Sequence, residues 1–238
     1  MKRISKCLNF ELKYLSKSTL VFLGFYFGIY IVIAALILLS NKNGDSTANV
    51  NTSFCIAGAI YIFAFITSSY KTLFNNLMMF GNTRKSIVFS SFIAYAALSV
   101  VISVISIISI LLDNSFTAVS GNGGFDLLDM LYQGNVNIAT KFLWFIAFFI
   151  LVSSFAMLYG SLTYKFGKVF IGAFWIGFFF LMTLVPMILF ESVSRIFNTF
   201  FRLDNTNGIL LAPLNFILAA AILGAGVWLA ARRQPQNA

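Results

Sequence analysis

Long apolar runs separated by short polar stretches set the pattern of this chain. Six runs are long enough to be candidate membrane-spanning helices: 19–40, 54–69, 87–112, 142–160, 169–190 and 209–231. A helix rises about 1.5 Å per residue, so a run of roughly 20 residues covers the hydrocarbon core of a bilayer. The run 54–69 is the shortest, and it spans only if its helix continues through Tyr70. The pattern predicts an all-α integral membrane protein with one domain over residues 1–238.

Two polar stretches outside these runs carry apolar residues at helical spacing. The lead 1–18 has a stripe of Ile4, Cys7, Leu8, Leu12 and Leu15. This stripe predicts an interfacial helix lying flat on the inner membrane surface, with an unstructured basic tail as the alternative. The stretch 191–208 has a similar stripe, formed by Val193, Ile196, Phe197, Phe200 and Phe201. It predicts an amphipathic helix at the outer surface, which either roofs a substrate route or plugs the bundle.

The stretch 70–86, between the second and third runs, has the signals of an elbow. Its apolar residues recur at helical spacing and predict a short amphipathic helix: Leu73, Phe74, Leu77 and Met78. Gly81 and Asn82 end that helix. Thr83 then caps a new helix that begins with Arg84 and Lys85. Two helices joined through a glycine break form a corner at the membrane surface.

Composition and charge fix the class and the orientation. With 60% hydrophobic and 10% charged residues, the chain cannot cover itself with a polar surface as a soluble domain does. If both termini lie on one side, only four of the 16 basic residues fall on the other side: Lys42, Lys141, Arg195 and Arg202. The positive-inside rule then places both termini in the cytoplasm. The net charge of +9 follows from this topology and from attraction to anionic lipids, so nucleic acid is not expected as a partner.

Catalytic chemistry is not indicated by the residues. No Asp, Glu, Lys, Arg or His lies deep within any of the six runs, where ion-coupled transporters usually place one. The chain has no histidine, and the membrane separates Cys7 from Cys55, so we expect neither a metal site nor a disulfide. Gly167 and Lys168 lack the rest of a phosphate-binding loop. A transporter of this kind needs an external motor, and the elbow is the best place for contact with one.

The elbow also resembles a known family. Phe80-Gly81-Asn82-Thr83-Arg84-Lys85 resembles the aromatic-x-Gly-x-Ser/Thr-Arg-Lys signature of permease subunits in ABC-2 type transporters from Gram-positive bacteria, here with Phe80 directly before Gly81. The amphipathic lead and the amphipathic segment before the last run are similar to that family as well. The resemblance therefore covers nearly the whole chain.

The resemblance implies a place in the bacterial cell membrane and a set of partners. Two permeases, either two copies or this chain and a sister permease, would assemble with two copies of a separate cytoplasmic ATPase. ATP and Mg²⁺ would bind to that ATPase, so this chain would be no enzyme and would bind no cofactor. A coupling helix between the second and third runs would rest on the ATPase. Its residues would be Leu73, Phe74, Leu77, Met78, Gly81 and Arg84.

The resemblance further implies export of amphipathic or antimicrobial peptides, or immunity against them, as in lantibiotic, bacitracin and phenol-soluble modulin systems. Aromatic residues are the candidates for a path for such peptides or for lipid-like substrates, unless they face lipid tails: Phe25, Tyr26, Tyr30, Phe174, Trp175 and Phe178. Gly24 and Gly28 are candidates for close packing in a dimer. An ATP-independent transporter or channel, and a non-transporting immunity or sensor subunit, remain the alternatives.

Overall fold

The chain folds into a bundle of long helices. The computed structural model describes residues 2–42, 54–120, 128, 131–132, 136–202 and 208–232. Its helices are α1 (Lys2–Lys42), α2 (Phe54–Met79), α3 (Arg84–Ser120), α5 (Ile138–Phe166), α6 (Lys168–Phe201) and α7 (Gly208–Arg232). No β-strand occurs within the described ranges. The predicted all-α class is confirmed for that part of the chain.

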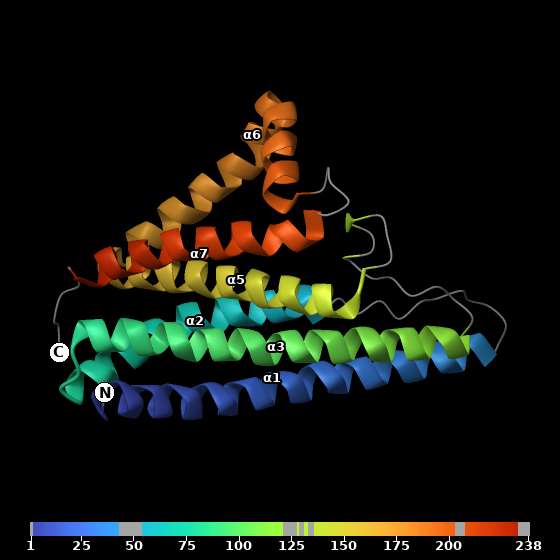
Figure 1. The fold of residues 1–238 in the computed structure, drawn as a ribbon, viewed down its shortest axis with the longest axis horizontal. Coiled ribbons are helices and arrows are strands. Elements are labelled where there is room, and N and C mark those ends of the chain that lie inside the picture. Colours follow the sequence, from blue (N-terminus) through green and yellow to red (C-terminus); the bar gives the residue numbers. More distant parts are fainter. Residues whose placement is uncertain are drawn as a thin grey trace.

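Helix α5 lies at the centre of the bundle and packs against α7, α2 and α3. Helix α1 runs along α3 on the side away from α7 (Figure 1). The start of α1, the corner between α2 and α3 and the end of α7 all lie at one end of the bundle (Figure 1). We call this the terminal end, and we call the opposite end, where α2 and α7 begin, the far end.

Among the residues that the structure describes, five helices are long and apolar enough to cross a membrane. The qualifying segments are Ser5–Ala35, Phe54–Met79, Arg84–Ser115, Ile138–Phe166 and Gly208–Arg232. They correspond to the predicted first, second, third, fourth and sixth runs, and they give the chain the character of a multi-pass membrane protein. The predicted run 169–190 lies within α6. Its described apolar segment, Lys168–Phe180, is shorter than a span.

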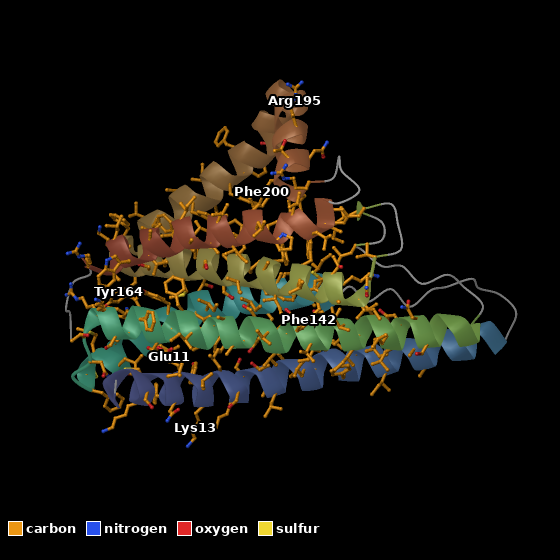
Figure 2. All side chains as sticks on the ribbon, viewed as in Figure 1. Glu11, Lys13, Phe142, Tyr164, Arg195 and Phe200 are labelled. Carbon is orange, nitrogen blue, oxygen red and sulfur yellow. The ribbon has the colours of Figure 1, made fainter. Side chains whose placement is uncertain are left out.

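The predicted interfacial helix 1–18 is not a separate element. Helix α1 is continuous from Lys2 to Lys42, because no glycine or proline interrupts the lead before the first apolar run. Cys7, Glu11 and Leu15 stand one turn apart on α1 and are all buried. Lys13 projects away from the bundle (Figure 2). The lead therefore packs along α3 as part of the bundle and does not lie apart from it.

Helix α6 continues through the predicted outer segment. We expected an amphipathic helix of its own within 191–208, but α6 is unbroken to Phe201, and its last part turns back toward α7 (Figure 1). The rings of Phe200 and Phe201 each pack against Phe216 of α7, with centroids 5.4 Å apart. The side chains of the other three stripe residues lie outside the described set: Val193, Ile196 and Phe197.

An aromatic cluster closes the far end of the bundle. Trp144 of α5 is 2% exposed, and its ring centroid lies 5.3 Å from that of Phe216. The indole N–H donates to the Tyr132 hydroxyl at 3.1 Å, and this hydroxyl donates to the carbonyl of Phe201 at 2.7 Å. These contacts tie the end of α6 to α5 and α7. They favour a plug over a roof for Phe200 and Phe201.

Small and hydroxylated residues let the central helices approach closely. A Cβ atom on Gly160 of α5 would lie only 2.9 Å from the Cβ of Tyr70 on α2, so glycine is needed at this crossing. Ser99 of α3 is fully buried, and its hydroxyl lies 3.2 Å from that of Ser153 on α5. Ser153 thus takes part in helix packing, as such hydroxyls do in membrane bundles.

Candidate functional site at the elbow

A four-residue corner joins α2 to α3. Helix α2 ends at Met79, and Gly81 adopts a φ of 72°, a left-handed conformation that glycine reaches without strain. The backbone N–H and the side-chain amide of Asn82 both donate to the carbonyl of Leu77, at 3.4 and 3.0 Å. They satisfy a carbonyl that the end of the helix leaves unpaired. The predicted helix stop at Gly81 and Asn82 is confirmed.

The cap on the next helix is present as well. Thr83 Oγ1 accepts a hydrogen bond from the backbone N–H of Ser86 at 3.3 Å. The Ser86 hydroxyl donates back to the carbonyl of Thr83 at 2.8 Å. A side-chain oxygen at this position satisfies one of the free N–H groups in the first turn of a helix. Thr83 is therefore the N-cap of α3, as the sequence predicted.

The predicted short helix of the elbow is in fact the end of α2. This helix runs for 26 residues without a break, which carries the predicted run 54–69 beyond Tyr70. The hydroxyls of Thr67 and Ser69 bond to backbone carbonyls four residues earlier, at 2.8 and 2.6 Å. Such bonds keep the polar side chains on the helix surface without interrupting it. A separate coupling helix is absent from this part of the described chain.

The apolar stripe of the elbow faces the inside of the chain. Leu73, Phe74 and Leu77 are 4%, 4% and 1% exposed. Phe74 and Leu77 share a buried cluster with Cys7 of α1 and Ile87 of α3. The stripe is thus covered by this chain itself, so in this packing these three side chains offer no open surface to a partner. The helical spacing of these residues indicated a buried face. It did not distinguish burial inside this chain from burial against a partner protein.

The large apolar side chains that the elbow exposes are those of Met79 and Phe80, which form its tip. These side chains are 73% and 70% exposed. The ring of Phe10 on α1 lies 6.0 Å from that of Phe80. Of the remaining predicted coupling residues, Met78 is half-buried and Gly81 is exposed. The tip therefore presents two large apolar side chains at the terminal end.

Arg84 joins the elbow to the end of α7. Its Nη1 donates to the backbone carbonyl of Arg232 at 2.7 Å. The last carbonyls of a helix lack partners and carry a partial negative charge, so a guanidinium is well placed there. Arg84 therefore caps the end of α7.

A cavity with two cationic side chains lies beside this contact. Its volume is about 830 Å³, and residues of α5 and α7 line it: Leu162, Lys165, Phe166, Gly226, Leu229, Ala230 and Arg232. Lys165 and Arg232 bring positive charge to walls that are otherwise apolar. This combination is suited to an anionic group attached to an apolar chain, such as a lipid phosphate.

The predicted substrate-path residues do not come together within one chain. Three belong to α1 and three to α6, on opposite sides of the bundle (Figure 1): Phe25, Tyr26 and Tyr30, and Phe174, Trp175 and Phe178. The ring of Tyr26 packs 4.5 Å from that of Phe54, and the ring of Phe174 packs 4.7 Å from that of Tyr159. Phe25 and Trp175 are 71% and 53% exposed. The six residues therefore form two separate aromatic surfaces.

Gly24 and Gly28 lie on an open face of α1. A Cβ atom at either position would meet nothing within 4 Å in this chain. Phe25 and Ile29, on the same stretch, are 71% and 59% exposed. The close packing predicted for these glycines is not made inside the chain, so the face is available to another helix.

One buried acid was missed by the sequence reasoning. Glu11 of α1 is 1% exposed, and Figure 2 shows it between α1 and α3. It stands four residues after Cys7 and four before Leu15, on the apolar stripe itself, and this spacing was a signal of burial.

The described residues include no group of three or more His, Cys, Asp or Glu side chains that could hold a metal ion. The features of the described chain that we consider further are the tip, the contact between Arg84 and α7, and buried Glu11. Comparison of the chain with protein-family models, with curated proteins and with solved structures found no match.

Proposed function

We propose that this chain is the membrane-spanning permease subunit of an ATP-driven ABC exporter. Its helical multi-pass character, the tight corner between α2 and α3 and the resemblance of residues 80–85 to the ABC-2 signature support the proposal. Two copies of a separate ATPase bind ATP and Mg²⁺, and this chain hydrolyses no ATP. The ATPase docks on the terminal end, which faces the cytoplasm of a bacterial cell.

The exposed tip on a rigid support is the observation that carries this proposal. Met79 and Phe80 are largely exposed, while Phe74 and Leu77, just before them, are fixed in the bundle. A rigid apolar anchor suits docking, because little conformational freedom is lost when it binds. The proposed coupling surface is therefore the tip, held in place by the contact between Arg84 and α7. It replaces the buried stripe in that role.

A pair of permeases completes the proposed transporter. The open face at Gly24 and Gly28 receives a second copy or a sister permease, since small residues let helices approach closely in membranes. The aromatic surface of α1 then lies beside this contact. Amphipathic or antimicrobial peptides, or lipid-like molecules, are the proposed substrates, because their apolar faces suit aromatic side chains.

The docking role of the tip is tested by the ATPase activity that co-purifies with a tagged chain from native membranes. The double change Met79→Ser and Phe80→Ser should lower this activity at least roughly tenfold, because losing interface anchors costs on the order of 2 kcal/mol or more. Phe166→Ser is the matched control, since Phe166 lies at the same end and is 53% exposed. A parent chain without ATPase activity, or a tip variant that retains it, contradicts the proposal.

Orientation gives a separate prediction. Thr83→Cys at the terminal end should resist an impermeant thiol reagent on intact cells, whereas Ser115→Cys toward the other end should react. Both positions are exposed, so packing does not limit the reaction, and Cys7 and Cys55 are first replaced by Ser. Labelling of Thr83→Cys from outside the cell would place the terminal end outside and remove any docking of a cytoplasmic ATPase.

A further inference from the structure

Glu11 is held inside the bundle, between α1 and α3 (Figure 2). Its Oε1 lies 2.8 Å from the hydroxyl of Ser91 and 3.3 Å from that of Ser90. Its Oε2 is buried and has no hydrogen-bond partner. An ionisable side chain buried in a membrane bundle is expensive and points to a functional site.

Among the residues that the structure describes, no cation faces this carboxyl group. The titratable groups around it are Cys7 on α1 and Tyr95 on α3. Tyr70 on α2 lies next to Tyr95. All three are buried, and such side chains are neutral near pH 7. Lys13 of α1 projects away from the bundle (Figure 2). An ionised Glu11 would therefore be a buried charge without a counter-charge, which is strongly unfavourable.

The two serines fit a protonated acid. A hydroxyl has a single hydrogen, and that of Ser90 bonds to the carbonyl of Ile87 at 2.9 Å. The oxygen of Ser90 is then free to accept a proton carried on Oε1 of Glu11. Ser91 donates to the same Oε1. With the proton there, Oε2 is a neutral carbonyl oxygen and not part of a buried negative charge.

We propose that Glu11 is a proton-binding site that holds residues 2–15 of α1 against α3. When the carboxyl group gives its proton to water at the terminal end, the carboxylate is better solvated outside the bundle. This part of α1 then separates from α3. Because the packed state is the one that binds the proton, raising the pH favours separation and lowering the pH favours packing.

The elbow responds to the same proton. Cys7 lies one turn before Glu11 and shares its buried cluster with Phe74 and Leu77. Separation of α1 therefore uncovers the stripe of the elbow. The inference rests on the surroundings of Glu11 and does not depend on the proposed permease function.

Cys7 reports on the separation of α1 from α3, because its side chain is only 1% exposed while the two helices are packed. In the full chain with Cys55→Ser, in detergent, the rate of Cys7 labelling by a small thiol reagent is measured against pH. The same series is measured with Glu11→Gln, which keeps the size of the side chain but cannot ionise. The labelling rate of the chain with Glu11, divided by that of the Glu11→Gln variant, should rise with pH by up to about tenfold per pH unit. An ionised Glu11 makes the nearby thiol less reactive, so this effect cannot produce the rise.

Two outcomes of the labelling experiment overturn the inference. One is a ratio that stays constant with pH. The other is a ratio that changes when Na⁺ replaces K⁺ at constant pH, because the occupant would then be a metal cation and not a proton. A low labelling rate for Glu11→Gln at every pH is the expected result, since the neutral amide has no charge to release.

Infrared spectroscopy tests whether the carboxyl group of Glu11 is protonated, without a substitution at this residue. The chain contains only two glutamates, Glu11 and Glu191, so glutamate labelled with ¹³C at the carboxyl carbon, combined with Glu191→Asp, reports on Glu11 alone. A labelled carboxylic-acid band at neutral pH is expected, and this band should convert to carboxylate as Cys7 becomes accessible. A spectrum with only labelled carboxylate at neutral pH contradicts the inference, even where Glu11→Gln fails to fold.

Discussion

Phe74→Ala is expected to lower the free energy of unfolding by about 3–5 kcal/mol, the usual cost of truncating a buried phenylalanine. Phe74 is 4% exposed, and its ring lies 5.9 Å from that of Tyr70 and 5.8 Å from that of Tyr164. The cavity left by the ring would be enclosed by helices on several sides, so collapse could not fill it. Thermal unfolding in detergent measures the loss.

The exposed neighbour Thr72 provides the matched control, and Thr72→Ala should change stability by less than about 0.5 kcal/mol. Comparing these two variants tests whether the stripe is buried within the chain or forms a docking surface for a partner. If Phe74→Ala left stability unchanged but abolished association with an ATPase, the stripe would be facing a partner, and the packing described for the elbow would be incorrect.

Trp144→Ala should be similarly damaging at the far end, with a loss of about 3–5 kcal/mol. The change removes a fully enclosed ring that touches Phe216, and it also removes the indole N–H that orients the Tyr132 hydroxyl. That hydroxyl would then hold the carbonyl of Phe201 less firmly. We therefore expect looser attachment of the end of α6 as well as lower stability, measured by thermal unfolding and by protease sensitivity of α6.

Two further substitutions sharpen the test of this cluster. Trp144→Phe keeps most of the apolar contact but lacks the N–H donor, so it should show a smaller loss of stability. Leu143→Ala, at the adjacent position on α5, should be nearly neutral because Leu143 is 57% exposed. Equal losses for Leu143→Ala and Trp144→Ala would show that the face of α5 turned toward α7 has been assigned wrongly.

Local signals in the sequence predicted local structure correctly. Gly81 and Asn82 stop α2, and Thr83 caps α3, because these effects depend on a few neighbouring residues. Most of the apolar runs are recovered as long helices for a similar reason, since burying apolar surface in lipid or protein favours any sufficiently long run. The corner and the main helices were therefore accessible from the sequence alone.

Contacts between helices could not be predicted from the sequence in the same way. The stripe with Phe74 and Leu77 had the spacing of a contact face, but spacing does not distinguish a partner protein from α1 and α3 of the same chain. The burial of Glu11 depends on serines that are about 80 residues away in the sequence, and no local signal links them to it. The two aromatic surfaces were joined into one path because nothing in the sequence places α1 and α6 on opposite sides.

The unbroken course of α2 into the corner gives the elbow a mechanical property. With 26 residues, α2 is a rod roughly 39 Å long, and the tip is fixed to one end of it without a flexible linker. Force applied at Phe80 is therefore not absorbed by local bending but tilts the whole rod. A tilt of roughly 5° about Tyr70, which lies roughly 24 Å along the rod from Phe54, moves that end of the rod by roughly 2 Å. A small displacement at one membrane surface is thus delivered directly to the other, with Gly160 and Tyr70 as the crossing about which the rod pivots against α5.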